Sequence, residues 1–229
     1  MKKISLILSI LAFSLSHLYA QPAKKTPFTH PFVNPVDQAG IPRVLIIGDS
    51  ISIGYTPRVR GLLDGKANVH RPTTNCRWSA FGDQEIEKWL GDSKWDLVHF
   101  NFGLWDWYGW AQKVKSTPES YAASLDSIIG KIKKKSKAKL VFAMTTPPCI
   151  GPEGKVKFVV SEERAKSFND AARAVMKKHG VQINDLYQVI AKERAKYQRG
   201  ENNVHYTDEG RDLLAAQVVK VINQNFTNK

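Results

Sequence analysis

The sequence predicts an α/β protein in which a parallel five-stranded sheet is covered by helices on both faces. Short apolar runs with strand character alternate along the chain with longer segments of helical character, and this alternation is typical of parallel sheets. Glycine or proline ends several of the runs, at Gly48, Gly103 and Pro147. The chain has 229 residues, of which 42% are hydrophobic, so it is long enough for one domain with a buried core.

The elements follow in order. Strands are predicted at residues 43–47, 67–70, 95–101, 139–145 and 181–186, and helices at 56–63, 82–90, 117–135, 161–180 and 207–226. Thr117 and Pro118 are typical of a helix start, as a capping residue followed by a first-turn proline. Gly180 is typical of a helix end. We expect the functional site at the carboxyl ends of the strands.

The first 20 residues differ in composition from the rest. Lys2 and Lys3 precede an apolar run, residues 4–16, and the small residue Ala20 ends the segment. This pattern predicts a signal peptide at 1–20, an extended lead at 21–41 and a single domain at 42–229. An uncleaved anchor is the weaker alternative, because a membrane span needs about 20 apolar residues. We therefore expect a secreted or periplasmic protein without stable membrane insertion.

The chain is strongly basic, with a formal net charge of +13 from 34 Lys and Arg against 21 Asp and Glu. Such an excess suggests an anionic neighbour but says nothing about the fold. Export and the lack of a recognisable binding motif disfavour nucleic acid. Cys76 and Cys149 would meet an oxidising compartment, so one disulfide or two separate buried thiols are the alternatives. The sequence predicts no oligomeric state.

Two residues with catalytic potential lie at the ends of predicted elements. Ser50 lies in Gly48-Asp49-Ser50, where the glycine permits a sharp turn and the next helix can point N–H groups at an anion. His205 lies in a loop just before the last helix. A serine and a histidine are the minimum for nucleophilic acyl transfer. Either residue alone is more often structural, so the hypothesis requires that the two meet.

Four sequence blocks, in this order, resemble those of the SGNH (GDSL-type) hydrolases, small esterases and lipases. They are residues 48–50, 75–82, 101–106 and 202–205. The resemblance implies a three-layer α/β/α, flavodoxin-like fold and carboxylic ester hydrolysis without a metal or organic cofactor. It also implies Ser50 as the nucleophile and His205 as the base. The backbone N–H groups of Ser50 and Gly82 would form the oxyanion hole.

Two positions depart from the family's pattern. Trp105 stands where the third block, Gly-x-Asn-Asp, has the asparagine that donates to the oxyanion, and Asn101 is the nearby amide that would replace it. Asn202 stands where the last block, Asp-x-x-His, has the acid of the triad. An amide oxygen can still orient an imidazole, so Asn202 is the predicted orienting residue. A backbone carbonyl, Glu201 or Asp208 are the alternatives.

The predicted substrate rests on the aromatic segment after the third strand. Trp105 and Trp107, together with Arg77, are candidates for substrate binding, although alternate positions in such a run usually face the interior. With export and a basic charge, they favour an O-acetyl ester on a carbohydrate, including anionic polysaccharides. Lipase or lysophospholipase activity ranks lower, because no long apolar lid is present. A catalytically weak or inactive carbohydrate-binding relative is the alternative from another class.

Overall fold

The computed structural model describes residues 30–109, 115–151 and 160–227. The predicted signal peptide at 1–20 and the start of the predicted lead lie outside these ranges. The described residues contain one sheet, with strands β1 (Arg43–Ile47), β2 (Asn68–His70), β3 (Leu97–Phe100), β4 (Lys139–Ala143) and β5 (Gln182–Asn184). Among these residues, no helix is long and apolar enough to cross a membrane.

All neighbouring strands are parallel, and the order across the sheet is β2-β1-β3-β4-β5. This is the flavodoxin-like order, so the predicted fold class is confirmed. The order reverses at β1, because the chain first adds β2 on one side of it and then returns to add β3 on the other. In such sheets ligands bind at the carboxyl ends of the strands beside the reversal. The site is therefore expected after β1 and β3.

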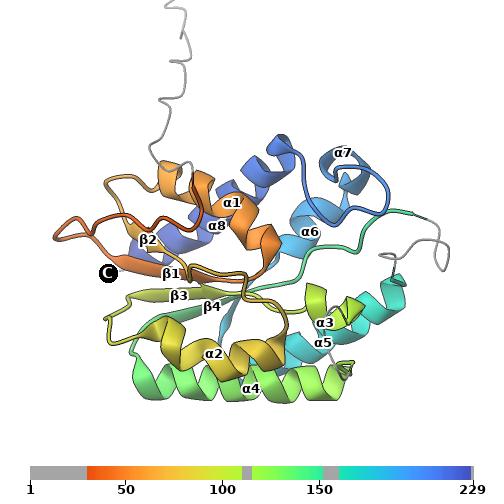
Figure 1. Cartoon of the computed structure of the whole chain (residues 1–229), viewed down its shortest axis with the longest axis horizontal. Coiled ribbons are helices and arrows are strands. Elements are labelled where there is room, and N and C mark those ends of the chain that lie inside the picture. Colours follow the sequence, from red (N-terminus) through yellow and green to blue (C-terminus); the bar gives the residue numbers. More distant parts are fainter. Residues whose placement is uncertain (1–29, 110–114, 152–159, 228–229) are drawn as a thin grey trace, which may run out of the picture.

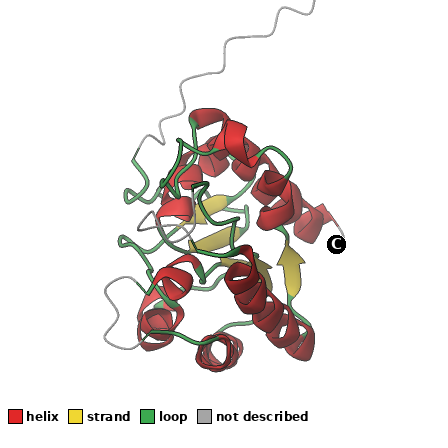
Figure 2. Ribbon diagram, turned by 90° about the vertical axis from the view of Figure 1, so that its right-hand side faces the viewer, coloured by secondary structure: helices red, strands yellow, loops and turns green. Residues whose placement is uncertain are grey.

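The helices form two layers, one on each face of the sheet (Figures 1 and 2). In one layer α8 (Asp208–Thr227) packs against α1 (Ser50–Leu62) and α6 (Leu186–Ala191). In the other layer α4 (Pro118–Lys135) packs against α2 (Ser79–Leu90) and α5 (Glu162–His179). The short helix α3 (Leu104–Tyr108) follows the carboxyl end of β3, and α7 (Arg194–Tyr197) precedes the loop that leads to α8.

Three helices, α3, α6 and α7, were not predicted, because four to six residues are too few to establish a helical period. Helix α1 begins at Ser50, six residues before the predicted start at residue 56. The cause is Asp49, whose side chain accepts the Ile51 N–H at 2.9 Å and caps the helix. The cap places Ser50 in the first turn of a helix that follows directly on β1.

The core lies on both faces of the sheet. Four residues of β1 and all of β3 are buried, which explains why these strands are continuous apolar runs without alternation. Leu125, Ile128 and Ile132 of α4 are fully buried at helical spacing. The sheet is therefore a rigid support for the loops at its carboxyl edge.

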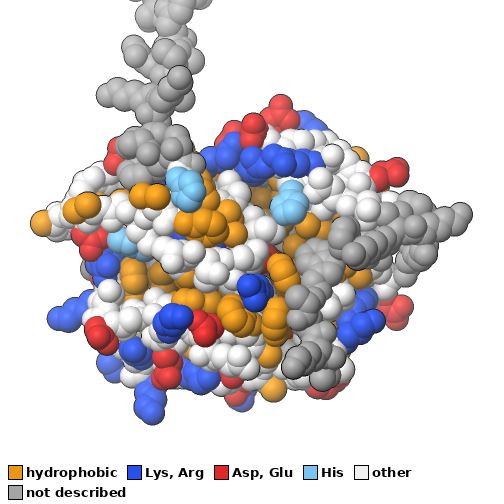
Figure 3. All heavy atoms as spheres, in the orientation of Figure 1, with side chains coloured by type: hydrophobic (Ala, Val, Ile, Leu, Met, Phe, Trp, Pro, Cys, Tyr) orange, Lys and Arg blue, Asp and Glu red, His pale blue; other side chains and the backbone are white. Residues whose placement is uncertain are grey.

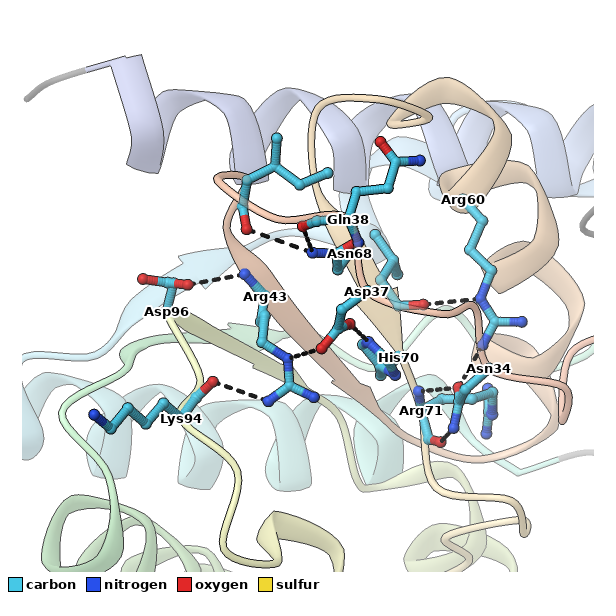
Figure 4. A network of polar contacts seen from close by, with 12 residues as sticks. Asn34, Asp37, Gln38, Arg43, Arg60, Asn68, His70, Arg71, Lys94 and Asp96 are labelled. Carbon is cyan, nitrogen blue, oxygen red and sulfur yellow. Dashed lines mark hydrogen bonds and ion pairs between the residues drawn. The ribbon is translucent and has the colours of Figure 1, made fainter.

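The described part of the predicted lead, residues 30–41, is held against the β2 edge of the sheet by a polar network (Figure 4). Asn34 Oδ1 accepts from Arg60 Nη2 at 2.7 Å and from the Arg71 N–H at 2.9 Å. Asp37 contacts His70 Nε2 at 2.6 Å. The side chains of Arg60 and Arg71 are almost fully buried, so the lead covers two cations that would otherwise face solvent.

Candidate active site

Ser50 and His205 are 155 residues apart in sequence, and the fold brings them into hydrogen-bond contact. The Ser50 Oγ and His205 Nε2 atoms are 3.1 Å apart. Ser50 is set by the turn after β1, and His205 by the loop between α7 and α8. An antiparallel bridge between Gln198 and Tyr206 closes that loop, and the Arg199 N–H donates to the His205 carbonyl at 3.0 Å. The two residues required for acyl transfer therefore lie together.

Asn203 fixes the tautomer of His205. Its Oδ1 atom accepts the backbone N–H of His205 at 3.0 Å and lies 3.1 Å from His205 Nδ1. A backbone N–H can only donate, so the amide atom at this position is the oxygen, and Nδ1 must carry the proton that points at it. Nε2 then presents its lone pair to the Ser50 hydroxyl, as a general base requires.

The residue that contacts His205 Nδ1 is thus Asn203. The block pattern predicted Asn202, the residue before it, for this role. Asn202 has a left-handed backbone with φ +56°, and its N–H donates to the Ile150 carbonyl at 2.8 Å. Asparagine tolerates this conformation, and it turns the chain just before Asn203. The spacing of Asn203 and His205, i and i+2, is that of an Asx turn and is the sequence signal that would have identified the pair.

The imidazole of His205 is partly buried beside positive charge. Burial lowers the pKa of His205 below its usual 6.5, and the charges of Arg199 and Arg211 lower it further. No carboxylate of the described residues forms an ion pair with the ring. Asp208, one of the alternatives to Asn202, binds Arg58 and Arg211. The base is therefore neutral near pH 7, and its orienting partner is uncharged.

Two buried charged residues, Asp49 and Arg71, stabilise the turn at residues 48–50, which is called the nucleophile turn below because it carries Ser50. Asp49 caps α1, and burial raises its pKa to about 6. Arg71 donates to the Gly48 carbonyl at 3.2 Å and to Ser52 Oγ at 3.1 Å. In the described chain the Ser50 N–H donates to no group, because it belongs to the first turn of α1. It is free to donate to an oxyanion.

Gly82, the second expected oxyanion donor, has another role. Its N–H donates to the Trp78 carbonyl at 3.0 Å within the first turns of α2. A Cβ atom at this position would lie 2.3 Å from Cζ of the buried Phe102 ring. Glycine is therefore required for close packing of α2 against the segment after β3, and its N–H is already bonded.

Replacing Gly82 by Ala is expected to lower the free energy of unfolding by about 2–3 kcal/mol, because the added methyl overlaps a ring that has no space to retreat. Urea denaturation of the purified protein measures this. The double variant Gly82→Ala/Phe102→Leu should lose less than the sum of its two single variants, since the smaller side chain makes room. A Gly82→Ala protein of normal stability would contradict the packing role.

The loop that does reach the nucleophile turn is residues 75–78. The Cys76 N–H donates to the Gly48 carbonyl at 3.3 Å, and the Arg77 N–H to Asn75 Oδ1 at 2.9 Å. Arg77 has φ +56°, a left-handed conformation that glycine adopts more easily. The sequence did not point to this loop as an oxyanion donor, because the position with the left-handed backbone is an arginine and not a glycine. Among the described residues no group accepts the Trp78 N–H, so this loop offers a second free donor beside the turn.

Asn101, the expected replacement for the missing oxyanion side chain, faces the sheet. Its Nδ2 donates to the Ala143 carbonyl at 2.7 Å and to Thr145 Oγ1 at 3.2 Å. These two bonds use both amide protons, and they join the carboxyl ends of β3 and β4. Asn101 therefore has no proton left for an oxyanion in this structure, and its role is to hold the floor of the site.

The three residues predicted to bind substrate differ in their exposure. Trp107 is 2% exposed and belongs to the core, so it does not face substrate. Trp105 is half-buried, and its ring centroid lies 6.2 Å from that of Trp78. Arg77 is exposed, with its guanidinium 5.0 Å from the centroid of the Phe81 ring. Arg77 and Trp105 are thus the ends of an aromatic cluster that begins in the 75–78 loop, and they remain candidates for substrate binding.

An open cleft of about 730 Å³ lies beside the serine and the histidine. It is lined by Pro31, Ser50, Ile53, Gly54, Pro57, Arg58, His205, Arg211 and Asp212. Figure 3 shows a band of Lys and Arg side chains over the region of α1 and α8. Pro31 belongs to the lead, and Arg60 Nη1 donates to the carbonyls of His30 and Val33 on either side of it, so Arg60 also positions one wall of this cleft.

The described residues contain no cluster of three or more His, Cys, Asp or Glu side chains arranged to hold a metal ion. Cys76 and Cys149 are both buried and are not joined to each other, so the structure has the second of the two predicted alternatives. Cys76 belongs to the loop at the nucleophile turn, whereas Cys149 Sγ lies 3.6 Å from the Tyr108 hydroxyl. The site chemistry of this part of the chain rests on hydroxyl, imidazole, amide and guanidinium groups.

Comparison with known proteins identifies relatives of this arrangement. The model of the GDSL-like Lipase/Acylhydrolase family matches residues 46–213. No curated protein sequence matches the chain. A solved lipase/acylhydrolase from Enterococcus faecalis is similar with a TM-score of 0.66 and 19% identity, covering 80% of this chain and 96% of that one.

Two further solved structures are esterases. A carbohydrate acetylesterase from Sinorhizobium meliloti has a TM-score of 0.65 and 15% identity, covering 80% of this chain and 99% of its own. An acetylxylan esterase from Geobacillus stearothermophilus has a TM-score of 0.63 and 17% identity, covering 79% and 94%. At these identities the likeness is one of fold.

Proposed function

Because this chain belongs to the GDSL-like lipase/acylhydrolase family, we propose that it is an exported serine esterase that removes O-acetyl groups from carbohydrate. Membership of the family makes it a carboxylic ester hydrolase. The observation that carries the proposed mechanism is the 3.1 Å contact between Ser50 Oγ and the unprotonated nitrogen of His205. The orienting contact of Asn203 at Nδ1 supports the same assignment.

The proposed reaction has two acyl transfers. Ser50 Oγ attacks the ester carbonyl while its proton passes to His205 Nε2, and the N–H groups of Ser50 and the 75–78 loop stabilise the oxyanion. The bond to the alcohol then breaks, and the alcohol oxygen takes the proton from Nε2. Water repeats the sequence on the acyl-enzyme and releases the acid and free Ser50.

Two features support a short acyl group on a sugar. The cleft wall at α1 and α8 carries charged side chains, Arg58, Arg211 and Asp212, which a long acyl chain would have to desolvate. The 75–78 loop, which contacts the turn before Ser50, carries Trp78 with Trp105 beside it, and aromatic faces suit the apolar faces of sugar rings. Two solved relatives of the fold are described as acetylesterases of carbohydrates. Export is supported by the basic start and apolar run of residues 1–20.

The test is acetate release by the protein purified without residues 1–20, measured on acetylated xylan and acetylated pectin, beside p-nitrophenyl esters of increasing acyl length. We expect acetyl esters to be hydrolysed fastest, with Ser50→Ala as the baseline. Preference for chains of eight carbons or more would identify a lipase instead. Glycan binding without any Ser50-dependent hydrolysis would identify an inactive binding protein.

A further inference from the structure

Three arginines lie near the base, and two of them, Arg58 and Arg211, line the cleft wall formed by α1 and α8. Arg211 lies across α1, where its Cδ atom is 3.5 Å from the Cβ position of Gly54, and it lines the cleft with Ser50 and His205. Arg58 lines the same cleft from α1. The backbone of Arg199 is bonded to that of His205, and the charges of Arg199 and Arg211 both act on the imidazole.

Carboxylates balance these cations only in part. Arg58 binds both Asp208 and Asp212, and Arg211 Nη1 shares Asp208 at 2.9 Å. Arg199 forms no ion pair within the described ranges, and only its Nε has a partner, the Tyr206 carbonyl at 3.2 Å. In this part of the chain the two carboxylates thus pair with Arg58 and Arg211, and Arg199 and Arg211 keep N–H donors that no carboxylate of the described residues occupies.

This charge imbalance has a consequence for the reaction. When Ser50 attacks, His205 becomes an imidazolium, and in serine hydrolases an aspartate beside the ring stabilises that charge. Here the group at Nδ1 is the neutral amide of Asn203, and the nearest unbalanced charges are cationic. The transition state therefore forms a positive charge in a positive environment. A negative group placed at Arg199 and Arg211 would oppose this cost.

We propose that Arg199 and Arg211 bind a carboxylate of the substrate, and that this carboxylate supplies the negative charge that the Ser50–His205–Asn203 triad lacks. The inference rests on the proposed function and adds to it the substrate class, O-acetylated acidic polysaccharides. Guanidinium groups match carboxylates in geometry and charge. The cleft is open, so a sugar unit next to the acetylated one in the polysaccharide can reach it. The chain has 34 basic and 21 acidic residues, and this excess of positive charge favours encounter with such a polyanion.

The experiment compares two forms of one polymer, acetylated polygalacturonate and the same polymer with its carboxylates converted to amides. Acetate release gives kcat and KM on each. The wild type is expected to prefer the carboxylate form by about tenfold in kcat/KM, and salt should reduce the preference. In Arg199→Gln/Arg211→Gln the ratio should fall close to one. Arg199→Gln alone, which removes no packing against Gly54, should lower it in part.

Two control variants test the interpretation. Lys134→Gln/Lys137→Gln removes the same charge from exposed positions at the end of α4, and it should leave the ratio unchanged. Asn203→Asp places a carboxylate at the imidazole, so the advantage in kcat should shrink while the advantage in KM remains.

The outcomes separate the two proposals. If neither polymer releases acetate in a Ser50-dependent way, the proposed function itself fails. If both polymers are deacetylated equally, or if the double arginine variant keeps the full preference, the carboxylate subsite is wrong and the esterase stands. If the lysine variant loses the preference as strongly as the arginine variant, net charge explains it and the subsite is also wrong.

Discussion

Replacing Ser50 by Ala is expected to lower kcat for acetyl ester hydrolysis by about 10⁴–10⁶-fold, because no other hydroxyl can form the acyl-enzyme at this position. His205→Ala should cost about as much, since the hydroxyl then keeps its proton. The measurement is steady-state hydrolysis of p-nitrophenyl acetate, with mass spectrometry of the quenched enzyme to detect the acylated serine.

The two residues act as one unit, so the double variant Ser50→Ala/His205→Ala should be no slower than either single variant. Ser124→Ala serves as the matched control, because Ser124 is a partly exposed serine of α4 whose Oγ, within the described residues, bonds only the Ser120 carbonyl. Additive losses in the double variant, or an acyl group on another residue, would refute the assigned nucleophile and base.

Replacing Asn203 by Ala is expected to lower kcat by about 10²-fold or more, because the imidazole loses the acceptor that holds its proton on Nδ1. Asn202→Gly is the discriminating variant: glycine adopts φ +56° freely, so this protein should keep most of the wild-type kcat. Loss of activity in Asn202→Gly with normal activity in Asn203→Ala would reverse the assignment.

The contact between His205 and Asn203 also predicts how hydrolysis depends on pH. Burial and the two arginines lower the pKa of His205, and the base works only when neutral, so kcat/KM of the wild type should fall in acid with a midpoint below 6.5. In Asn203→Asp the new carboxylate stabilises the protonated ring, so the midpoint should move to higher pH. Burial also raises the pKa of Asp49 and of Asp106, a buried residue of α3, to about 6, so circular dichroism over the same range must show an intact fold. An unchanged midpoint in Asn203→Asp would show that residue 203 does not face the ring.

The sequence was sufficient to predict the sheet and to place Ser50 and His205 at its carboxyl edge, for a physical reason. Buried parallel strands are continuous apolar runs, and their order along the chain fixes where the loops after β1 and before α8 must lie. Ser50 follows one such strand directly, so its placement depends on little else. His205 is positioned by the start of α8, which its helical pattern already predicts.

The groups around Ser50 and His205 were harder to predict, because their contacts depend on the direction of each side chain. Asn202 and Asn203 are adjacent and chemically identical, and only the left-handed backbone of the first decides which amide meets the imidazole. Asn101 is near the oxyanion position in sequence, but its protons are used by groups of β4 that are more than forty residues away. The Asx-turn spacing of Asn203 and His205 is the one local signal for the first fact, and the second has no local signal.

The contact between Ser50 and His205 joins α1 to the loop before α8, across 155 residues. Such a contact needs the elements between its two ends to be in place before it can form. A chain that is still being synthesised holds Ser50 long before His205 exists to contact it. Ester hydrolysis is therefore unavailable until α8 has docked, and recovery of activity during refolding reports completion of the whole domain, whereas recovery of helix signal does not.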